Sequence, residues 1–184
     1  MVQGRFEDGL GEVRRAVALD PLSPYVNTEF GRVLVLVGRY AEAVDQLRKA
    51  IALDPSRNRP YNLMGRALHL QGKTAEALTV FDESIKRGAP PVGVEWLVCA
   101  EVDAGSREKA LVLLEAQLRA DRAARRLAET YACLGDAEHA LEYLEKALAE
   151  RQAGLAEIVQ APELAWLRPE ARFAALRHKL NLAP

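Results

Sequence analysis

The sequence predicts an all-α fold, a solenoid in which antiparallel helix pairs stack in series. Two observations predict it. Four stretches of this 184-residue chain can be superposed at a nearly constant offset, and within each stretch small and large apolar residues recur at spacings of three and four. A period of this length is typical of helical arrays, whose product is an extended binding surface. We therefore expect a protein that binds another molecule, and not one with an active site.

Glycines mark the repeat most clearly. They recur at steps of 34, 34, 33 and 30 residues, at Gly4, Gly38, Gly72, Gly105 and Gly135. Each is expected to close an apolar helical stretch in the left-handed backbone conformation, which glycine adopts without steric cost. The ladder therefore predicts where helices end.

The helix after each glycine carries a strip of small, large and small residues on one face. The strips are Gly9, Val13 and Ala16; Ala43, Leu47 and Ala50; Ala77, Phe81 and Ser84; Ala110, Leu114 and Gln117; and Ala140, Leu144 and Ala147. The preceding helices pair a large residue with a small one, at Phe30-Gly31, Met64-Gly65 and Leu127-Ala128. At such positions small residues let the partner helix approach and large residues fill the remaining space.

In these columns the chain resembles the tetratricopeptide repeat family, over roughly residues 4 to 150. The resemblance implies a right-handed superhelix of antiparallel helix pairs. Residues 1–150 would form the array, with a first copy that lacks its first helix and about four repeats after it. Residues 151–184 would form capping helices.

Two departures from the pattern matter. The helix expected at residues 5–19 has no partner helix before it, so either the chain is cut from a longer protein or a neighbouring molecule covers that face, as in a homodimer. The third copy ends in Gly88-Ala89-Pro90-Pro91 where earlier copies have Asp-Pro. Irregular packing is expected around residues 88–104.

Beyond residue 150 the period stops. A short helix is expected near residues 153–159, then a turn carrying Trp166, then a helix from Glu170 whose apolar residues seal the end of the array. The pairs Leu167-Arg168 and Arg172-Phe173 resemble the closing segment of repeat domains attached to bacterial winged-helix regulators, adenylate cyclases and serine/threonine kinases. This resemblance implies the sensor or scaffold part of a larger bacterial regulator.

Members of the repeat family bind ligands in a concave groove lined by the first helix of each pair. The resemblance places in that groove Tyr25, Thr28, Arg32, Arg59, Asn62, Arg66, His69, Arg122, Arg125 and Arg126. Six arginines would make the groove basic, and guanidinium groups suit carboxylates, so an acidic peptide or protein segment is the expected partner. The alternative is a solvated helix face in an arginine-rich chain.

Composition and motifs exclude other classes of function. Lysine and arginine (25) nearly balance aspartate and glutamate (26), which argues against a nucleic-acid binder. Neither a leader segment nor an apolar run of membrane-spanning length occurs, so a cytoplasmic location and no membrane are expected. Catalytic and metal-ligand motifs are missing, so we expect no enzyme, metal or cofactor.

The cysteines and tryptophans are expected to serve packing. Cys99 and Cys133 form no metal-ligand spacing, fit a reducing compartment, and should pack as small apolar residues. Trp96 and Trp166 are expected to be buried, with an exposed partner anchor as the alternative for Trp166.

Overall fold

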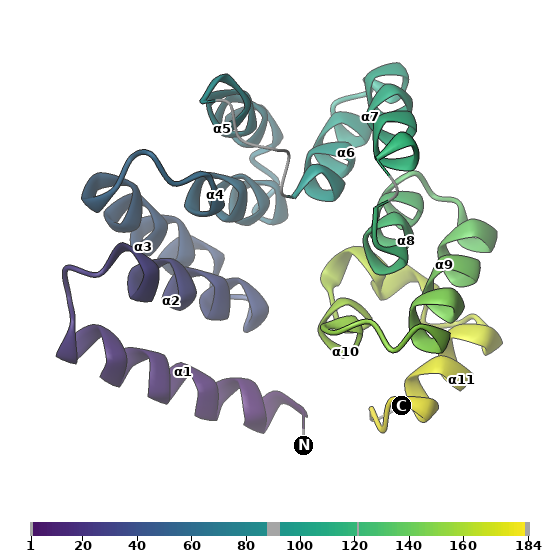
Figure 1. Cartoon of the computed structure of the whole chain (residues 1–184), viewed down its shortest axis with the longest axis horizontal. Coiled ribbons are helices and arrows are strands. Elements are labelled where there is room, and N and C mark those ends of the chain that lie inside the picture. The colour runs from purple at the N-terminus through teal and green to yellow at the C-terminus, as the bar shows by residue number, and fades with distance from the viewer. Residues whose placement is uncertain (1, 88–92, 121, 183–184) are drawn as a thin grey trace. The chain divides into compact units, whose positions relative to one another are not determined.

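All regular structure in the described residues is helical, which confirms the all-α prediction (Figure 1). The structure is a computed structural model that describes residues 2–87, 93–120 and 122–182, with side chains from Gly9 onward. The Gly88–Pro91 segment, where the sequence predicts that irregular packing begins, lies outside the described residues. None of the described helices has the length and apolar character needed to cross a membrane.

The chain forms two units, residues 1–93 and 94–184. The helices of unit 1 are α1 (Val2–Leu19), α2 (Pro24–Leu36), α3 (Tyr40–Leu53), α4 (Asn58–Leu70) and α5 (Thr74–Lys86). The helices of unit 2 are α6 (Val94–Asp103), α7 (Arg107–Arg119), α8 (Ala124–Cys133), α9 (Ala137–Ala149), α10 (Leu155–Ile158), the 3-10 helix η1 (Pro162–Leu167) and α11 (Ala171–Lys179). From α1 to α5 in unit 1 and from α6 to α9 in unit 2, consecutive helices pack against one another in series. The division at residue 150 and the right-handed superhelical sense stay predictions.

The glycine ladder sets the ends of four helices. Gly38, Gly72, Gly105 and Gly135 have φ angles of 79°, 77°, 79° and 76°, the left-handed conformation that the sequence predicts. After Gly38 the amide of Arg39 donates to the carbonyl of Leu34 at 2.8 Å, which satisfies a carbonyl at the helix end. The prediction is wrong for Gly4, which lies inside α1 because the helix continues through it from Val2.

Close approach of the two helices of a pair explains why small residues on one helix face large residues on the other. A Cβ atom built on Gly31 would lie 2.5 Å from Cγ of Leu47, and one on Gly65 would lie 2.7 Å from the ring of Phe81. Leu47 is 0% exposed and Phe81 is 2% exposed, so neither side chain has room to move aside. Glycine is therefore required where α2 meets α3 and where α4 meets α5.

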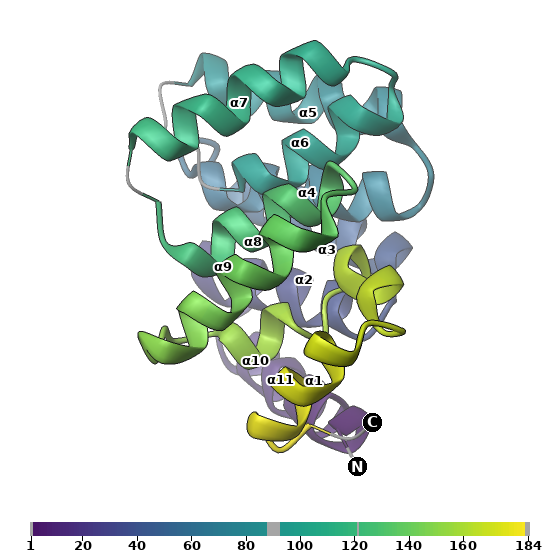
Figure 2. The same cartoon turned by 90° about the vertical axis from the view of Figure 1, so that its right-hand side faces the viewer.

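The tail after residue 150 packs against the preceding helices of unit 2. Figure 2 turns α9, α10 and α11 toward the viewer, and the tail packs against α8 and α9. Phe173 of α11 and both Leu164 and Leu167 of η1 are fully buried. Their apolar side chains stabilise the unit by leaving water. In contrast, Trp166 is 45% exposed, so the expectation that it is buried is wrong.

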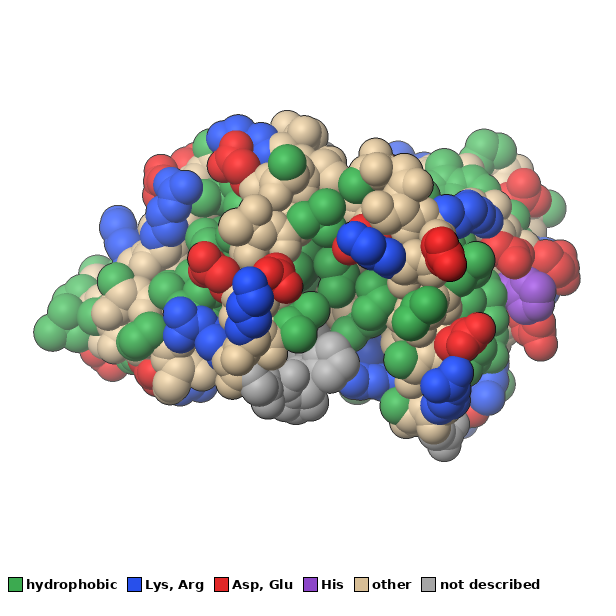
Figure 3. Space-filling view, turned by 90° about the horizontal axis from the view of Figure 1, so that it is seen from above, with side chains coloured by type: hydrophobic (Ala, Val, Ile, Leu, Met, Phe, Trp, Pro, Cys, Tyr) green, Lys and Arg blue, Asp and Glu red, His purple; other side chains and the backbone are tan. Residues whose placement is uncertain are grey.

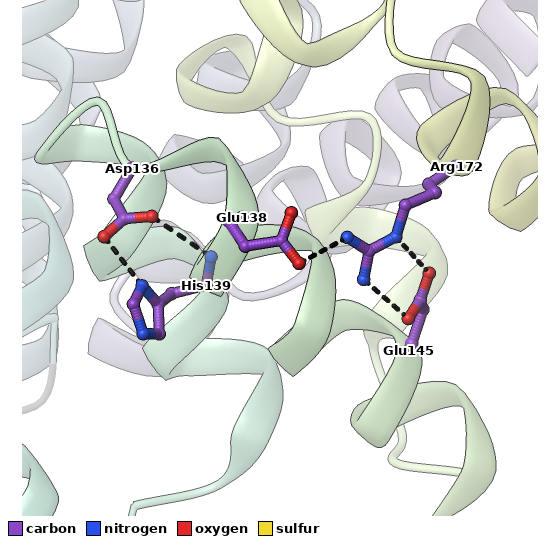
Figure 4. A network of polar contacts seen from close by, with 5 residues as sticks. All are labelled: Asp136, Glu138, His139, Glu145 and Arg172. Atoms are coloured by element: carbon purple, nitrogen blue, oxygen red, sulfur yellow. Dashed lines mark hydrogen bonds and ion pairs between the residues drawn. The ribbon is translucent and has the colours of Figure 1, made fainter.

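A polar contact also holds the tail in place (Figure 4). Arg172 of α11 donates two hydrogen bonds of 2.9 Å to the carboxylate of Glu145 and one of 2.8 Å to Glu138, both on α9. Such a forked guanidinium–carboxylate contact is directional. The Arg172 hydrogen bonds lower the pKa of the Glu145 carboxyl below its ordinary value of 4.5. Arg172 thus fixes the orientation of α11 on α9.

Replacing Arg172 with glutamine is expected to lower the thermal unfolding midpoint near pH 7 and to have no effect in acid. Because the folded-state pKa of Glu145 is depressed, its contribution is present above 4.5 and is lost as the pH falls through the lowered pKa. Melting curves of the wild type and the variant from about pH 7 to pH 3 measure this. Arg168→Gln, at an exposed position of the same tail, is the control. A difference that persists unchanged in acid would contradict the ion-pair explanation.

Candidate peptide-binding surface

Each unit has its own candidate surface on the first helices of its pairs, which are α2 and α4 in unit 1 and α6 and α8 in unit 2. Local sequence fixes where α2 begins: Pro24 occupies the first turn, and the Ser23 hydroxyl accepts a hydrogen bond from the amide of Val26 at 3.3 Å. The side-chain amide of Asn27 donates to the carbonyls of Pro21 at 3.0 Å and Ser23 at 2.8 Å. Gln46 of α3 donates in turn to the Asn27 side-chain oxygen. This buried amide pair ties α2 to the preceding turn and to α3.

Glu29 organises the charged side chains of α2 and α4. One of its carboxylate oxygens lies 2.7 Å from the guanidinium of Arg59, and the other accepts a hydrogen bond of 2.8 Å from Arg32. The side chain of Arg59 is 53% exposed, whereas Arg32 is 27% exposed and Glu29 is 19% exposed. A carboxylate between two guanidinium groups cancels part of the positive charge and holds both groups in fixed positions.

The other predicted residues of unit 1 differ widely in exposure. Tyr25 is 58% exposed at the start of α2, as expected for a ligand contact. Thr28 is buried, and its hydroxyl donates to the carbonyl of Pro24 at 2.6 Å within the same helix. Asn62 and Arg66 are also buried, at 5% and 4% exposed, and His69 is partly buried. The expectation that Thr28, Asn62 and Arg66 face outward is wrong.

In unit 2 a buried ion pair replaces the expected open basic surface. The guanidinium of Arg126 on α8 contacts the carboxylate of Glu95 on α6, which is 2% exposed. Arg122 and Arg125 are partly buried near the start of α8, where the backbone amide of Arg125 donates to the side-chain oxygen of Gln152 at 3.0 Å. Removing one member of a buried pair leaves an unpaired charge in the interior. We therefore expect Arg126 to contribute to the stability of unit 2 more than to ligand binding.

The acids that balance these arginines are what the sequence prediction missed. Glu95 lies ten residues before Gly105, in the column that holds Thr28 and Asn62 in the two earlier copies. Aligning that column in the third copy as well would have identified Glu95. Glu29 offers no such signal, since only the fold brings it to Arg59. On the face shown in Figure 3, basic and acidic side chains likewise alternate.

The cysteines depart from their predicted role. Cys99 of α6 and Cys133 of α8 are joined by a disulfide, with Cα atoms 4.8 Å apart, so they do more than pack as small apolar residues. Their positions 34 residues apart place them on neighbouring first helices, a pairing that a single helix pattern does not reveal. Within the described ranges, the acids, histidines and cysteines form no group of three or more that could hold a metal ion.

Comparisons with known proteins agree with this architecture. A family model described as "TPR repeat" matches residues 31–72, and one described as "Tetratricopeptide repeat" matches residues 122–155. No curated protein matches the chain significantly. The two matched segments fall in different units, one covering α2 to α4 and the other covering α8 and α9.

Three solved structures with the same fold are similar to this chain, and two of them are described as TPR proteins. TTC0263, a thermophilic TPR protein of Thermus thermophilus, is 22% identical, with 94% of this chain and 91% of that chain covered and a TM-score of 0.67. MamA is 19% identical, with 82% and 91% covered and a TM-score of 0.55. YrrB, a TPR protein with an unusual peptide-binding site, is 18% identical, with 91% and 89% covered and a TM-score of 0.53.

At these identities the similarity shows the fold alone, whereas the family models act on the sequence itself. The repeat ladders, the left-handed glycines and the serial packing of helix pairs agree with both. Residues 31–72 and 122–155 of this chain thus match tetratricopeptide repeats in sequence, and the whole chain shares their fold.

Proposed function

We propose that this chain is a non-catalytic interaction module that binds a peptide or protein segment on its first helices, α2 and α4 above all. The fold generally serves as an interaction scaffold, and one structure with the same fold is described as having a peptide-binding site. The observation that carries the proposal is the half-exposed Arg59, oriented by Glu29 beside the exposed start of α2.

Arg59 and Tyr25 would make different kinds of contact with the ligand. A guanidinium has five N–H donors, and its contact with Glu29 leaves donors at the exposed edge for a ligand carboxylate. Tyr25 offers an exposed aromatic ring for apolar contact. An acidic segment with an adjacent apolar side chain is therefore the preferred ligand. A setting within a larger bacterial regulator remains a proposal from the tail residues Arg172 and Phe173.

Charge reversal of Arg59 tests the acidic-ligand proposal. We expect Arg59→Glu to weaken binding of acid-rich peptides, selected from an immobilised peptide library and measured by fluorescence anisotropy, by roughly tenfold at low salt. Arg48→Glu is the matched control, because Arg48 is 61% exposed on α3, a second helix of its pair. Equal effects of the two variants, or equal binding of lysine-rich peptides, would contradict the proposal. Arg66 and Arg126 are unsuitable for this test, because the burial of Arg66 and the pairing of Arg126 with buried Glu95 would confound binding with folding.

A second candidate function, homodimerisation through residues 5–19, rests on one contrast between the repeats. The strips of α3, α5, α7 and α9 are buried, whereas Gly9, Val13 and Ala16 of α1 are only partly buried. This strip has the small–large–small form that receives a first helix elsewhere in the chain. A second copy could cover it by placing its own strip against it, a self-complementary contact.

Molecular mass in solution checks the dimer. Val13→Arg is expected to convert a concentration-dependent dimer to a monomer in sedimentation equilibrium, because a charge would be buried in the contact. Ala18→Arg, at an exposed position of the same helix, should leave the dimer intact. A wild-type chain that is monomeric at every concentration up to about 100 µM would exclude an affinity of the micromolar order that this contact requires.

A further inference from the structure

The disulfide occupies a particular place in the repeat. Cys99 precedes Gly105 by six residues, the same distance that separates Arg32 from Gly38 and Arg66 from Gly72. In this column Arg66 is 4% exposed and Cys99 is 6% exposed, so both positions are buried. Cys133 is the last residue of α8. The bridge therefore joins the first helices of two successive repeats, at the spacing on which any ligand lying across α6 and α8 would depend.

The backbone brings the two residues together without help from the bond. Their Cα separation of 4.8 Å lies within the range of about 4.4–6.8 Å that a disulfide spans. Around them, Val94, Val98 and Leu127 form a buried apolar core between α6 and α8, with Cys133 packed against it. This packing holds the helices side by side whether or not the sulfurs are bonded.

The surroundings also suit the reduced pair. Sγ of Cys133 lies 3.6 Å from the carbonyl oxygen of Glu95, so a thiol at Cys133 can donate its proton to that carbonyl. Cys99 is only 6% exposed and serves in the reduced state as a small apolar residue. Cys133 as a residue is more exposed than Cys99, so we expect an external reagent to react with it first.

We propose that Cys99 and Cys133 form a reversible thiol–disulfide switch: oxidation adds a covalent link between α6 and α8, and reduction removes that link while the helices stay packed together. The oxidant is a small-molecule disulfide such as oxidised glutathione. The Cys133 thiolate attacks one sulfur of that disulfide, which forms a mixed disulfide and releases one small thiolate. The Cys99 thiolate then attacks Sγ of Cys133 and expels the second thiolate. One small-molecule disulfide becomes two thiols and the two protein thiols become one disulfide, with their protons passing to the released thiolates.

Reduction follows the same path backwards, beginning with attack of a small thiolate on the Cys133 sulfur. The consequence for stability is independent of any ligand. A bridge between residues 34 apart restricts the unfolded chain, so oxidation should lower the unfolding equilibrium constant of unit 2 by on the order of a hundredfold.

The experiment uses the whole chain equilibrated in buffers with graded ratios of reduced to oxidised glutathione. Free thiols are counted by maleimide labelling and mass spectrometry, and urea unfolding is followed by circular dichroism. We expect a reversible transition from two labelled thiols to none in the folded protein, reached from either direction, with the oxidised form unfolding at higher urea. Cys99→Ala/Cys133→Ala should unfold at the same urea concentration in every buffer.

Three outcomes would overturn the switch. Stable glutathione adducts at Cys133 without ring closure would show that Cys99 cannot resolve the mixed disulfide. Covalent dimers would show that the sulfurs meet between molecules and not within one. If glutathione reduces the disulfide only after urea has unfolded the chain, the disulfide is a permanent structural bond and not a switch. Since every readout is a thiol count or an unfolding curve, failure here is distinguishable from failure of the peptide-binding proposal.

Discussion

Replacing Phe173 with alanine is expected to lower the free energy of unfolding by about 3–5 kcal/mol, the largest effect foreseen for a single substitution in this chain. Phe173 is 0% exposed, so the deleted ring leaves a cavity that surrounding side chains fill only in part. Leu167 and Leu176 of the same tail are also buried. Urea unfolding followed by circular dichroism gives the difference in free energy directly.

Trp166→Ala is the control for this prediction. It removes a larger aromatic side chain from the same tail, but Trp166 is 45% exposed, so much less area returns to water on unfolding. We expect its cost to stay well below that of Phe173→Ala. If the two substitutions cost the same, the tail does not seal unit 2 in the way described.

Replacing Gly65 with valine is expected to destabilise unit 1 by about 1–3 kcal/mol through overpacking. The new Cβ would lie 2.7 Å from Cζ and Cε1 of Phe81, closer than carbon atoms can approach. Because Phe81 is 2% exposed, α4 and α5 must separate to relieve the clash. That separation loses contacts along the whole helix pair, which outweighs the gain in helix propensity from replacing glycine. Urea or thermal unfolding measures the loss.

The same substitution at Gly9 provides the control. A Cβ on Gly9 would meet no atom within 4 Å, and Gly9 lies in the interior of α1. Gly9→Val is therefore expected to change the free energy of unfolding by less than about 0.5 kcal/mol, or to raise it slightly. A loss at Gly9 equal to that at Gly65 would mean that backbone effects, and not the Phe81 contact, decide the outcome.

Local chemistry was readable from the sequence wherever it repeats. A glycine such as Gly72 ends its helix in the left-handed conformation because the requirement is met within a few residues of chain. The strip around Leu47 is buried because spacings of three and four put its members on one helix face. The helices of the tail, α10 and α11, also lie where the pattern placed them.

The charged surface was predicted less well. Assigning Arg66 to an open groove assumed that every copy presents the same face, but Arg66 is 4% exposed. The pairing of Glu95 with Arg126 crosses between helices 31 residues apart, so no local pattern indicates it. Counting arginines therefore overstated the positive charge that the first helices offer to a ligand.

By itself the sequence determined the repeat, the apolar strips and the four helix ends at Gly38, Gly72, Gly105 and Gly135, because these depend on backbone preference and helical periodicity within one repeat. Only the tertiary structure decided that Cys99 meets Cys133, that Glu29 meets Arg59 and that Trp166 stays exposed. Those outcomes depend on how neighbouring helices rotate and approach, which is set by the packing of many side chains at once.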